Sequence, residues 1–181
     1  MSAKNTYEVP LLEDERLAAL QRYQVLDTEP EQAFDELAFL AGAICGTPVA
    51  LITFVDADRQ WFKARIGLDT SETPRDAAFC ARTILGRDLM VISDTHRDAH
   101  FRDNPLVTGA PYIRFYAGAP LRTADELALG SLCVIDYVPR VLSQEQRLAL
   151  KSLGRLVVLQ LDARRQALDA REPHANGTRH Q

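Results

Sequence analysis

The segment from Tyr112 to Asp136 constrains the fold more than any other part of the chain. Two runs of strand-forming residues flank the polar residues Arg122 to Glu126, which predicts an antiparallel hairpin. In the first run, alternate positions form one apolar face: Ile113, Phe115, Ala117, Ala119 and Leu121. In the second run, apolar side chains project from both faces, so the sheet must be covered twice. Helices can cover one face, and loops or a short helix on the other face can enclose a pocket.

Length and charge argue against several classes of protein. The 181 residues suffice for one domain with a full core, and the net charge of -4 without a basic run argues against nucleic acid or a membrane surface as partner. The first residues lack the apolar core of a signal peptide, and no apolar run is long enough to span a bilayer. We therefore expect a soluble, cytoplasmic protein with a flexible arm at 1–12, a single domain at 13–170 and a disordered tail at 171–181.

Three further segments predict helices. Residues 13–23 form a short amphipathic pattern, and residues 28–45 begin with a capping box at Thr28–Glu31 before apolar residues recur at helical spacing. The last helix begins at a second capping box, Ser143 with Gln146, and runs to about Ala167. Its broad apolar face either buries fully against the sheet or leaves a part that pairs with a second copy of the chain.

The strand predicted at 60–67 contains the tryptophan of the chain. Simple alternation places Trp61 on the same face as Lys63 and Arg65, and Phe62 on the opposite face. Two interpretations stay open. Trp61 is either a partly exposed residue with cation–π neighbours or part of a ligand-binding face for an anionic or aromatic molecule.

Cys80 is the cysteine with the most reactive setting in the sequence. The three cysteines are widely spaced, which fits reduced thiols better than disulfides. Cys80 falls in the first turn of a short predicted helix, Ala77 to Leu85, where free backbone amides favour a thiolate. Packing of that helix onto the sheet explains the same residue equally simply, and we favour packing.

The polar run after the strand at 89–92 admits two interpretations. Asp94, His96, Asp98 and His100 alternate, so an extended chain would place four metal-binding side chains on one side. A loop of this composition more often turns, with Asp side chains accepting hydrogen bonds from backbone amides, and we favour the turn. The loop also carries apolar anchors and is a candidate lid for the pocket.

The order of these elements and three sequence stretches resemble the GAF domain family. The stretches are FVDADRQWFKARIGLDTSETPRDAAFCA, SDTHRDAHFRDNPLV and IRFYAGAPLRTADELALGSLCVIDYVPR. They are similar to the bacterial subgroup found N-terminal to sensor histidine kinases and diguanylate cyclases or as stand-alone proteins. The resemblance implies an α+β fold with an antiparallel sheet of about five or six strands, terminal helices on one face and a covered pocket on the other. It also implies a homodimer formed by the terminal helices and a signalling kinase or cyclase as partner.

Two departures from the family pattern narrow the range of possible ligands. The Asn-Lys pair of cyclic-nucleotide-binding members is absent, and Cys80 is followed by Ala81 where bilin-binding members usually carry His. The resemblance therefore favours neither a cyclic nucleotide nor a bilin, and the small molecule stays unidentified.

Three functions are compatible with the sequence. The first is a sensory module, not an enzyme, that binds a small molecule over the sheet and signals through the terminal helices. Its candidate ligand-binding residues are Trp61, Phe79, Cys80, Asp94, Phe101, Asn104, Phe115, Tyr116 and Cys133. The second is a thiol-dependent enzyme of the free methionine sulfoxide reductase type. Cys80 and Cys133 would be its thiol pair: one thiolate attacks the sulfoxide sulfur, and the other thiol forms a disulfide with it. The third is a dimerisation module whose cavity is filled by its own side chains.

Overall fold

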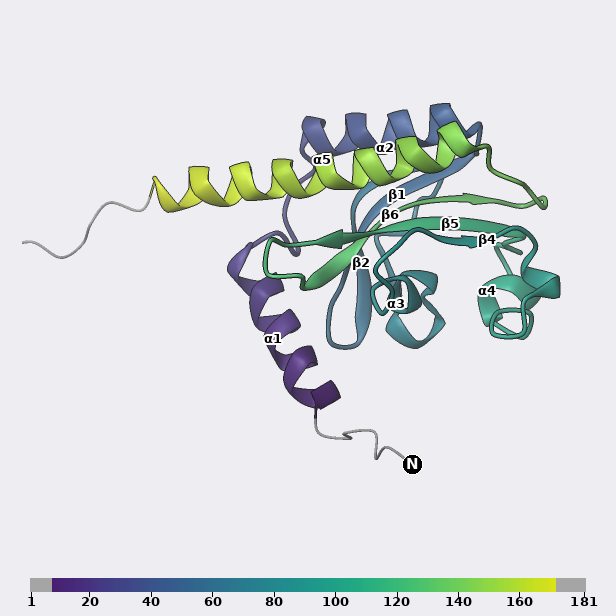
Figure 1. The fold of residues 1–181 in the computed structure, drawn as a ribbon, viewed down its shortest axis with the longest axis horizontal. Coiled ribbons are helices and arrows are strands. Elements are labelled where there is room, and N and C mark those ends of the chain that lie inside the picture. The colour runs from purple at the N-terminus through teal and green to yellow at the C-terminus, as the bar shows by residue number, and fades with distance from the viewer. Residues whose placement is uncertain (1–7, 172–181) are drawn as a thin grey trace, which may run out of the picture.

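The protein is built on a six-stranded sheet in which every neighbouring pair is antiparallel. The computed structural model describes residues 8–171 (Figure 1). The strand order is β3-β2-β1-β6-β5-β4. The strands are β1 Val49–Val55, β2 Arg59–Ile66, β3 Glu72–Pro74, β4 Met90–Ile92, β5 Phe115–Arg122 and β6 Ala128–Asp136. The predicted hairpin is β5 with β6, and the α+β fold that the resemblance implies is confirmed.

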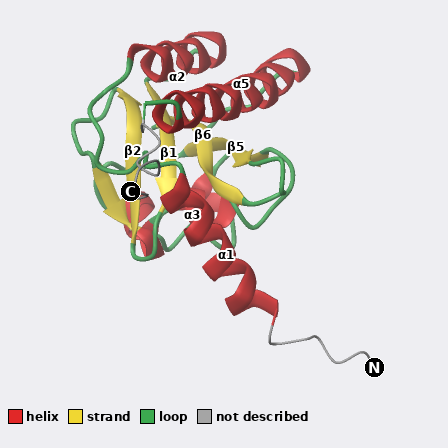
Figure 2. Ribbon diagram, turned by 90° about the vertical axis from the view of Figure 1, so that its left-hand side faces the viewer, coloured by secondary structure: helices red, strands yellow, loops and turns green. Residues whose placement is uncertain are grey.

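Helices cover the two faces of this sheet unequally. The helices at 32–45 and 144–169 lie side by side on one face, and short helices and loops cover the other (Figures 1 and 2). The helices are α1 Glu8–Arg22, α2 Gln32–Cys45, α3 Phe79–Thr83, α4 Pro105–Thr108 and α5 Gln144–Asp169, with single 3-10 turns at Arg75–Ala77 and Thr95–Arg97. Within residues 8–171, no helix combines the length and apolar character needed to cross a membrane.

Each face of the sheet has its own apolar core. On the side of α2 and α5, side chains such as Phe34, Phe115 and Leu150 pack together. On the side of α3 and α4, a second cluster contains Phe79 and Tyr116. Phe115 and Tyr116 are neighbours in β5 and point to opposite faces, as the alternation of a strand requires. The double cover predicted from the hairpin is therefore present.

Trp61 is buried, which corrects the prediction that it is partly exposed. Ile52 pairs with Ala64 and Thr53 with Phe62, so a β-bulge leaves Lys63 as the extra residue of β2. The bulge shifts the alternation and places both Trp61 and Ala64 in the core beside α2 and α5. Lys63 lies over the ring of Phe34, 5.5 Å from its centroid, and not over the tryptophan.

Two predicted helix starts differ from the structure. α1 begins at Glu8, inside the segment predicted as an arm, while residues 1–7 and 172–181 lie outside the described residues. α2 begins after Glu31, which makes no side-chain cap bond, so the capping box predicted at Thr28 is wrong. The Thr28 hydroxyl donates to Val25 O instead. The capping box of Ser143 with Gln146 at α5 is confirmed.

Candidate functional site

A cavity of about 370 Å³ lies on the sheet face that α3 and α4 cover. We call it the sheet cavity. Its walls come from the central strands, from the segment around α3 and from the loop between α4 and β5. The lining residues are Leu51, Gln60, Phe62, Leu68, Thr70, Thr73, Ala78, Phe79, Cys80, Leu106, Ala110, Pro111, Ile113, Tyr116 and Ile135. None of these side chains is charged, so the cavity suits apolar groups.

Two polar atoms in the wall lack partners. Gln60 and Thr73 are paired across β2 and β3. The Oε1 atom of Gln60 and the Oγ1 atom of Thr73 are buried and accept or donate no hydrogen bond within the described part of the chain. A buried polar group without a partner is costly, so both atoms are available to a bound molecule.

Two aromatic rings of the cavity wall, those of Phe79 and Tyr116, belong to a stack of three that also includes Phe101. The ring of Phe79 lies 4.2 Å from that of Phe101, with 8° between their planes. The centroid of the Phe79 ring lies 5.1 Å from that of the Tyr116 ring. The stack joins the loop, α3 and β5 into one wall, and aromatic contacts of this kind stabilise by about 1 kcal/mol beyond their burial.

Cys80 and Cys133 form a buried thiol pair beside this wall. Their Sγ atoms are 3.8 Å apart, and the Tyr116 hydroxyl donates to Cys80 Sγ at 3.3 Å. The same hydroxyl lies 2.7 Å from Thr83 Oγ1. Burial raises the pKa of the Cys80 thiol, but hydrogen bonds with Cys133, then with Ser131, Thr53 and Tyr116, together outweigh burial and lower the pKa to about 7. The hydrogen bond with Cys80, followed by burial, raises the pKa of Cys133.

The predicted ligand-binding residues divide among four places. Phe79, Cys80 and Tyr116 line the sheet cavity, and Cys133 contacts Cys80 behind it. Trp61 and Phe115 belong to the core on the opposite face of the sheet. Sequence reasoning did not select Gln60, although it lies two positions before Phe62 and alternation would place both on one face.

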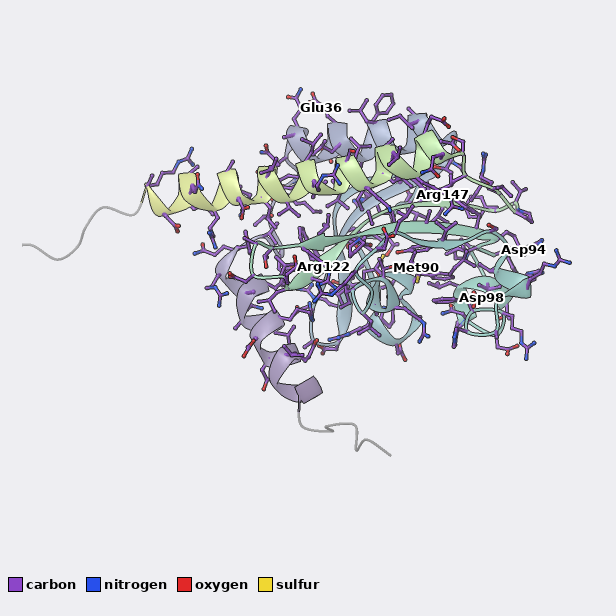
Figure 3. The ribbon with its side chains drawn as sticks, in the orientation of Figure 1. Glu36, Met90, Asp94, Asp98, Arg122 and Arg147 are labelled. Atoms are coloured by element: carbon purple, nitrogen blue, oxygen red, sulfur yellow. The ribbon has the colours of Figure 1, made fainter. Side chains whose placement is uncertain are left out.

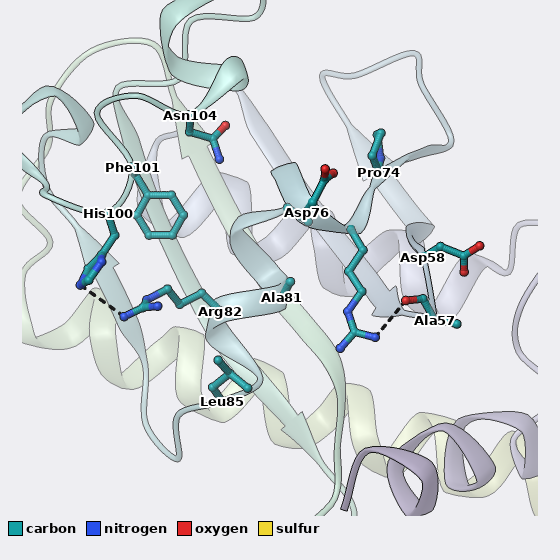
Figure 4. A pocket seen from close by; sticks show the side chains of 12 residues that line it. Ala57, Asp58, Pro74, Asp76, Ala81, Arg82, Leu85, His100, Phe101 and Asn104 are labelled. Carbon is teal, nitrogen blue, oxygen red and sulfur yellow. Dashed lines mark hydrogen bonds between the residues drawn. The ribbon is translucent and has the colours of Figure 1, made fainter. Parts of the chain in front are cut away.

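Phe101 and Asn104 line an open groove between α3 and the loop (Figure 4), which meets the sheet cavity at Ala78. This groove carries side chains of both charges, and Arg82 Nη2 lies 3.3 Å from His100 Nε2 across it. Asn104 caps α4 by accepting from Leu106 N and donates to Ala77 O. These bonds hold the loop over the cavity.

Asp94 and Asp98 lie at the α4 end of the sheet (Figure 3). Asp94 accepts hydrogen bonds from His96 N and from Arg114, and Asp98 accepts from His100 N. The turn interpretation of the polar run is confirmed, because both Asp side chains bond backbone amides nearby in the sequence. The structure does not bring Asp94 to the sheet cavity.

The chain belongs to the GAF domain family, whose model matches residues 29–161. A cyclic di-GMP phosphodiesterase of Pseudomonas aeruginosa is 45% identical over 167 residues, which cover 91% of this chain and 28% of that protein. Among solved structures, the chromophore-binding domain of a bacteriophytochrome from R. palustris has a TM-score of 0.63 at 14% identity, covering 88% of this chain and 64% of that one. The free methionine-R-sulfoxide reductase of Neisseria meningitidis has a TM-score of 0.61 at 17% identity, covering 92% and 98%.

The relative from Pseudomonas aeruginosa corrects the prediction that the protein is not an enzyme. Its name is that of an enzyme, and its identity to this chain is high. The chain spans 28% of the length of that relative. The two solved structures are below 25% identical and show the shared fold.

Proposed function

We propose that this chain is the sensory GAF unit of a protein that acts on cyclic di-GMP. A small molecule binds in the sheet cavity, and its binding changes the phosphodiesterase activity of the whole protein. The observation that carries the proposal is a cavity of about 370 Å³ over the sheet with two unpartnered polar atoms in its wall. The relative named as a cyclic di-GMP phosphodiesterase supports phosphodiesterase activity as the property that the ligand changes.

A cluster of ion pairs provides a physical route from the cavity to the long helices. Phe62 lines the cavity, and the next residue, Lys63, reaches the other side of the sheet. Lys63 Nζ lies 2.8 Å from Glu31 Oε1, and Arg164 Nε of α5 lies 2.7 Å from the same oxygen. A shift of β2 on ligand binding therefore acts directly on the start of α2 and on α5.

The long helices offer a surface for dimerisation. α2 and α5 run antiparallel, because Glu31 lies beside Arg164 while Gln146 Nε2 donates to Ile44 O. Both helices expose large apolar side chains, which together we call the α2–α5 apolar patch: Phe39, Leu40, Ile44, Leu148, Leu156 and Leu159. Large apolar side chains left exposed on neighbouring helices favour a protein–protein interface, so they support a homodimer through the terminal helices.

Native mass spectrometry of the protein purified from its own host tests the proposal. Wild type is compared with Ala78→Phe, which fills the cavity, and with Ala124→Phe, which adds the same ring at an exposed turn. We expect a mass excess over the denatured chain in wild type and Ala124→Phe, and none in Ala78→Phe. Folded wild-type protein without any mass excess would contradict the proposal.

A thiol-dependent redox enzyme is the second candidate, favoured by the 3.8 Å separation of Cys80 and Cys133. The Cys80 thiolate would attack the sulfur of a sulfoxide substrate, and Cys133 would then form the Cys80–Cys133 disulfide, while the sulfoxide is reduced to the sulfide and its oxygen leaves as water. The cavity fits free methionine sulfoxide poorly, because that amino acid carries two charges and no lining side chain is charged. Alkylation of native protein separates the candidates: rapid reaction of both thiols supports the enzyme, and protected thiols support the sensor.

A further inference from the structure

We infer that the ligand of the sheet cavity is an uncharged, largely apolar molecule with one hydrogen-bonding group that meets Gln60 and Thr73. This inference rests on the proposed function and adds the chemical class of the ligand.

The lack of charged side chains in the cavity wall limits which molecules can bind there. No side chain lining the cavity is charged. Two cations of β2 adjoin lining residues, and both are engaged elsewhere. Lys63, next to Phe62, pairs with Glu31 on the opposite side of the sheet. Arg59, next to Gln60, pairs with Asp27 and Glu72. A phosphate or carboxylate in the cavity would lose its hydration without gaining a counter-ion, and burying an unpaired charge is strongly unfavourable. Cyclic di-GMP and other nucleotides are therefore excluded from this cavity, so the molecule sensed differs from the nucleotide processed.

The shape and surface of the wall favour apolar and aromatic groups. The rings of Phe62, Phe79 and Tyr116 line the cavity together with aliphatic side chains. The volume of about 370 Å³ corresponds to about a dozen water molecules, which is enough for a ligand of one or two rings. Removal of this apolar surface from water supplies the affinity.

The unpartnered atoms define the polar end of the ligand. Gln60 Oε1 can only accept hydrogen bonds, and Thr73 Oγ1 can both donate and accept. They occupy paired positions on β2 and β3, so a single hydroxyl group on the ligand can donate to Gln60 while it accepts from Thr73. A ligand without a donor would leave Gln60 Oε1 buried and unsatisfied, which lowers its affinity.

Calorimetric titration with three matched probes tests this class. The probes are 2-naphthol, which is neutral with a donor, its methyl ether, which has no donor, and 2-naphthoate, which is an anion. We expect wild type to bind 2-naphthol about tenfold more tightly than the ether, and the naphthoate at least a hundredfold more weakly. In Gln60→Leu and Thr73→Val, we expect the preference for naphthol over the ether to shrink while affinity for the ether is retained.

Cavity variants locate the binding. Ala78→Phe should abolish binding of all three probes. Ala81→Phe, which adds the same ring in the groove alone, and Ala124→Phe should leave binding unchanged. The inference is overturned if 2-naphthoate binds as tightly as 2-naphthol and Ala78→Phe blocks it, if the naphthol preference survives in Gln60→Leu, or if folded wild type binds no neutral probe. Failure of the proposed function itself shows separately, as the lack of a mass excess in protein from the host.

Discussion

At the scale of single residues, Tyr116 connects the cavity to the thiol pair. Its ring lines the cavity and stacks on Phe79, while its hydroxyl donates to Cys80 and lies beside Thr83. Gly118 allows this position, because a Cβ there would lie 2.2 Å from the Tyr116 hydroxyl. Two alternate residues of β5 thus determine how the Cys80 thiol is hydrogen-bonded.

Replacement of Tyr116 by Phe should destabilise the protein and raise the pKa of Cys80. The variant loses buried hydrogen bonds, so we expect the free energy of unfolding to fall by about 1 kcal/mol. The pKa of Cys80 should rise because the hydroxyl no longer stabilises the thiolate. Urea unfolding and the pH dependence of alkylation measure the two effects. Tyr137→Phe, at a more exposed tyrosine, is the control, and equal behaviour of the two variants would contradict the role of Tyr116.

Glu13 should make stability depend on pH in the acid range. Hydrogen bonds from Arg16 and Arg75 lower the pKa of Glu13 to about 2, against the effect of burial. A depressed pKa stabilises the fold above the unfolded-state value of 4.5, and this contribution disappears as the pH falls from about 4.5 to 2. We expect Glu13→Gln to show a smaller loss of unfolding free energy over this interval than wild type, as measured by urea unfolding. The exposed Glu15→Gln should follow wild type, and a Glu13→Gln profile equal to wild type would refute the role of Glu13.

At the level of helices and strands, the sequence predicted the hairpin and the last long helix better than it predicted the residues of the cavity. The double-sided β6 and the capping box at Ser143 are local features, so the hairpin and α5 could be predicted. The bulge at Lys63 is one extra residue, which strict alternation cannot detect, and it places Ala64 on the face of Trp61 instead of the face of Phe62. The pairing of Gln60 with Thr73 joins strands through long-range contacts, so these two polar atoms were missed.

Glu31 should be the central residue of the contact between β2, α2 and α5. Its carboxylate neutralises Lys63, whose side chain is fully buried, and holds Arg164. We expect Glu31→Gln to lower the free energy of unfolding by about 2 kcal/mol, because both cations lose a charged partner. The same substitution at exposed Glu29, two residues earlier, should change stability by less than about 0.5 kcal/mol. Denaturant unfolding compares the two variants, and an equal small effect would show that the cluster contributes little.

At the scale of the whole molecule, the cavity and the proposed output surface lie on opposite faces of one sheet. α3 lies on one side of the sheet, and α2 and α5 lie on the other (Figure 2). The cavity is on the side of α3, and the α2–α5 apolar patch is carried by the two helices of the opposite side. β1 and β6 are buried along their whole length between them. A tightly packed sheet transmits small shifts between its two faces, so the proposed signal does not require any large rearrangement.

The proposed homodimer should depend on the α2–α5 apolar patch. Phe39 on α2 and Leu159 on α5 are 60% and 62% exposed, so a lysine at either position is compatible with the folded monomer. In a dimer each lysine would bury a charge against apolar surface, and we expect the dimer dissociation constant to rise at least about tenfold. Sedimentation equilibrium measures it, with Leu85→Lys as the control because Leu85 is 75% exposed and lies outside the patch. A monomeric wild type, or a dimer unaffected by Phe39→Lys and Leu159→Lys, would leave the signal to pass within one chain, through Lys63, Glu31 and Arg164 alone.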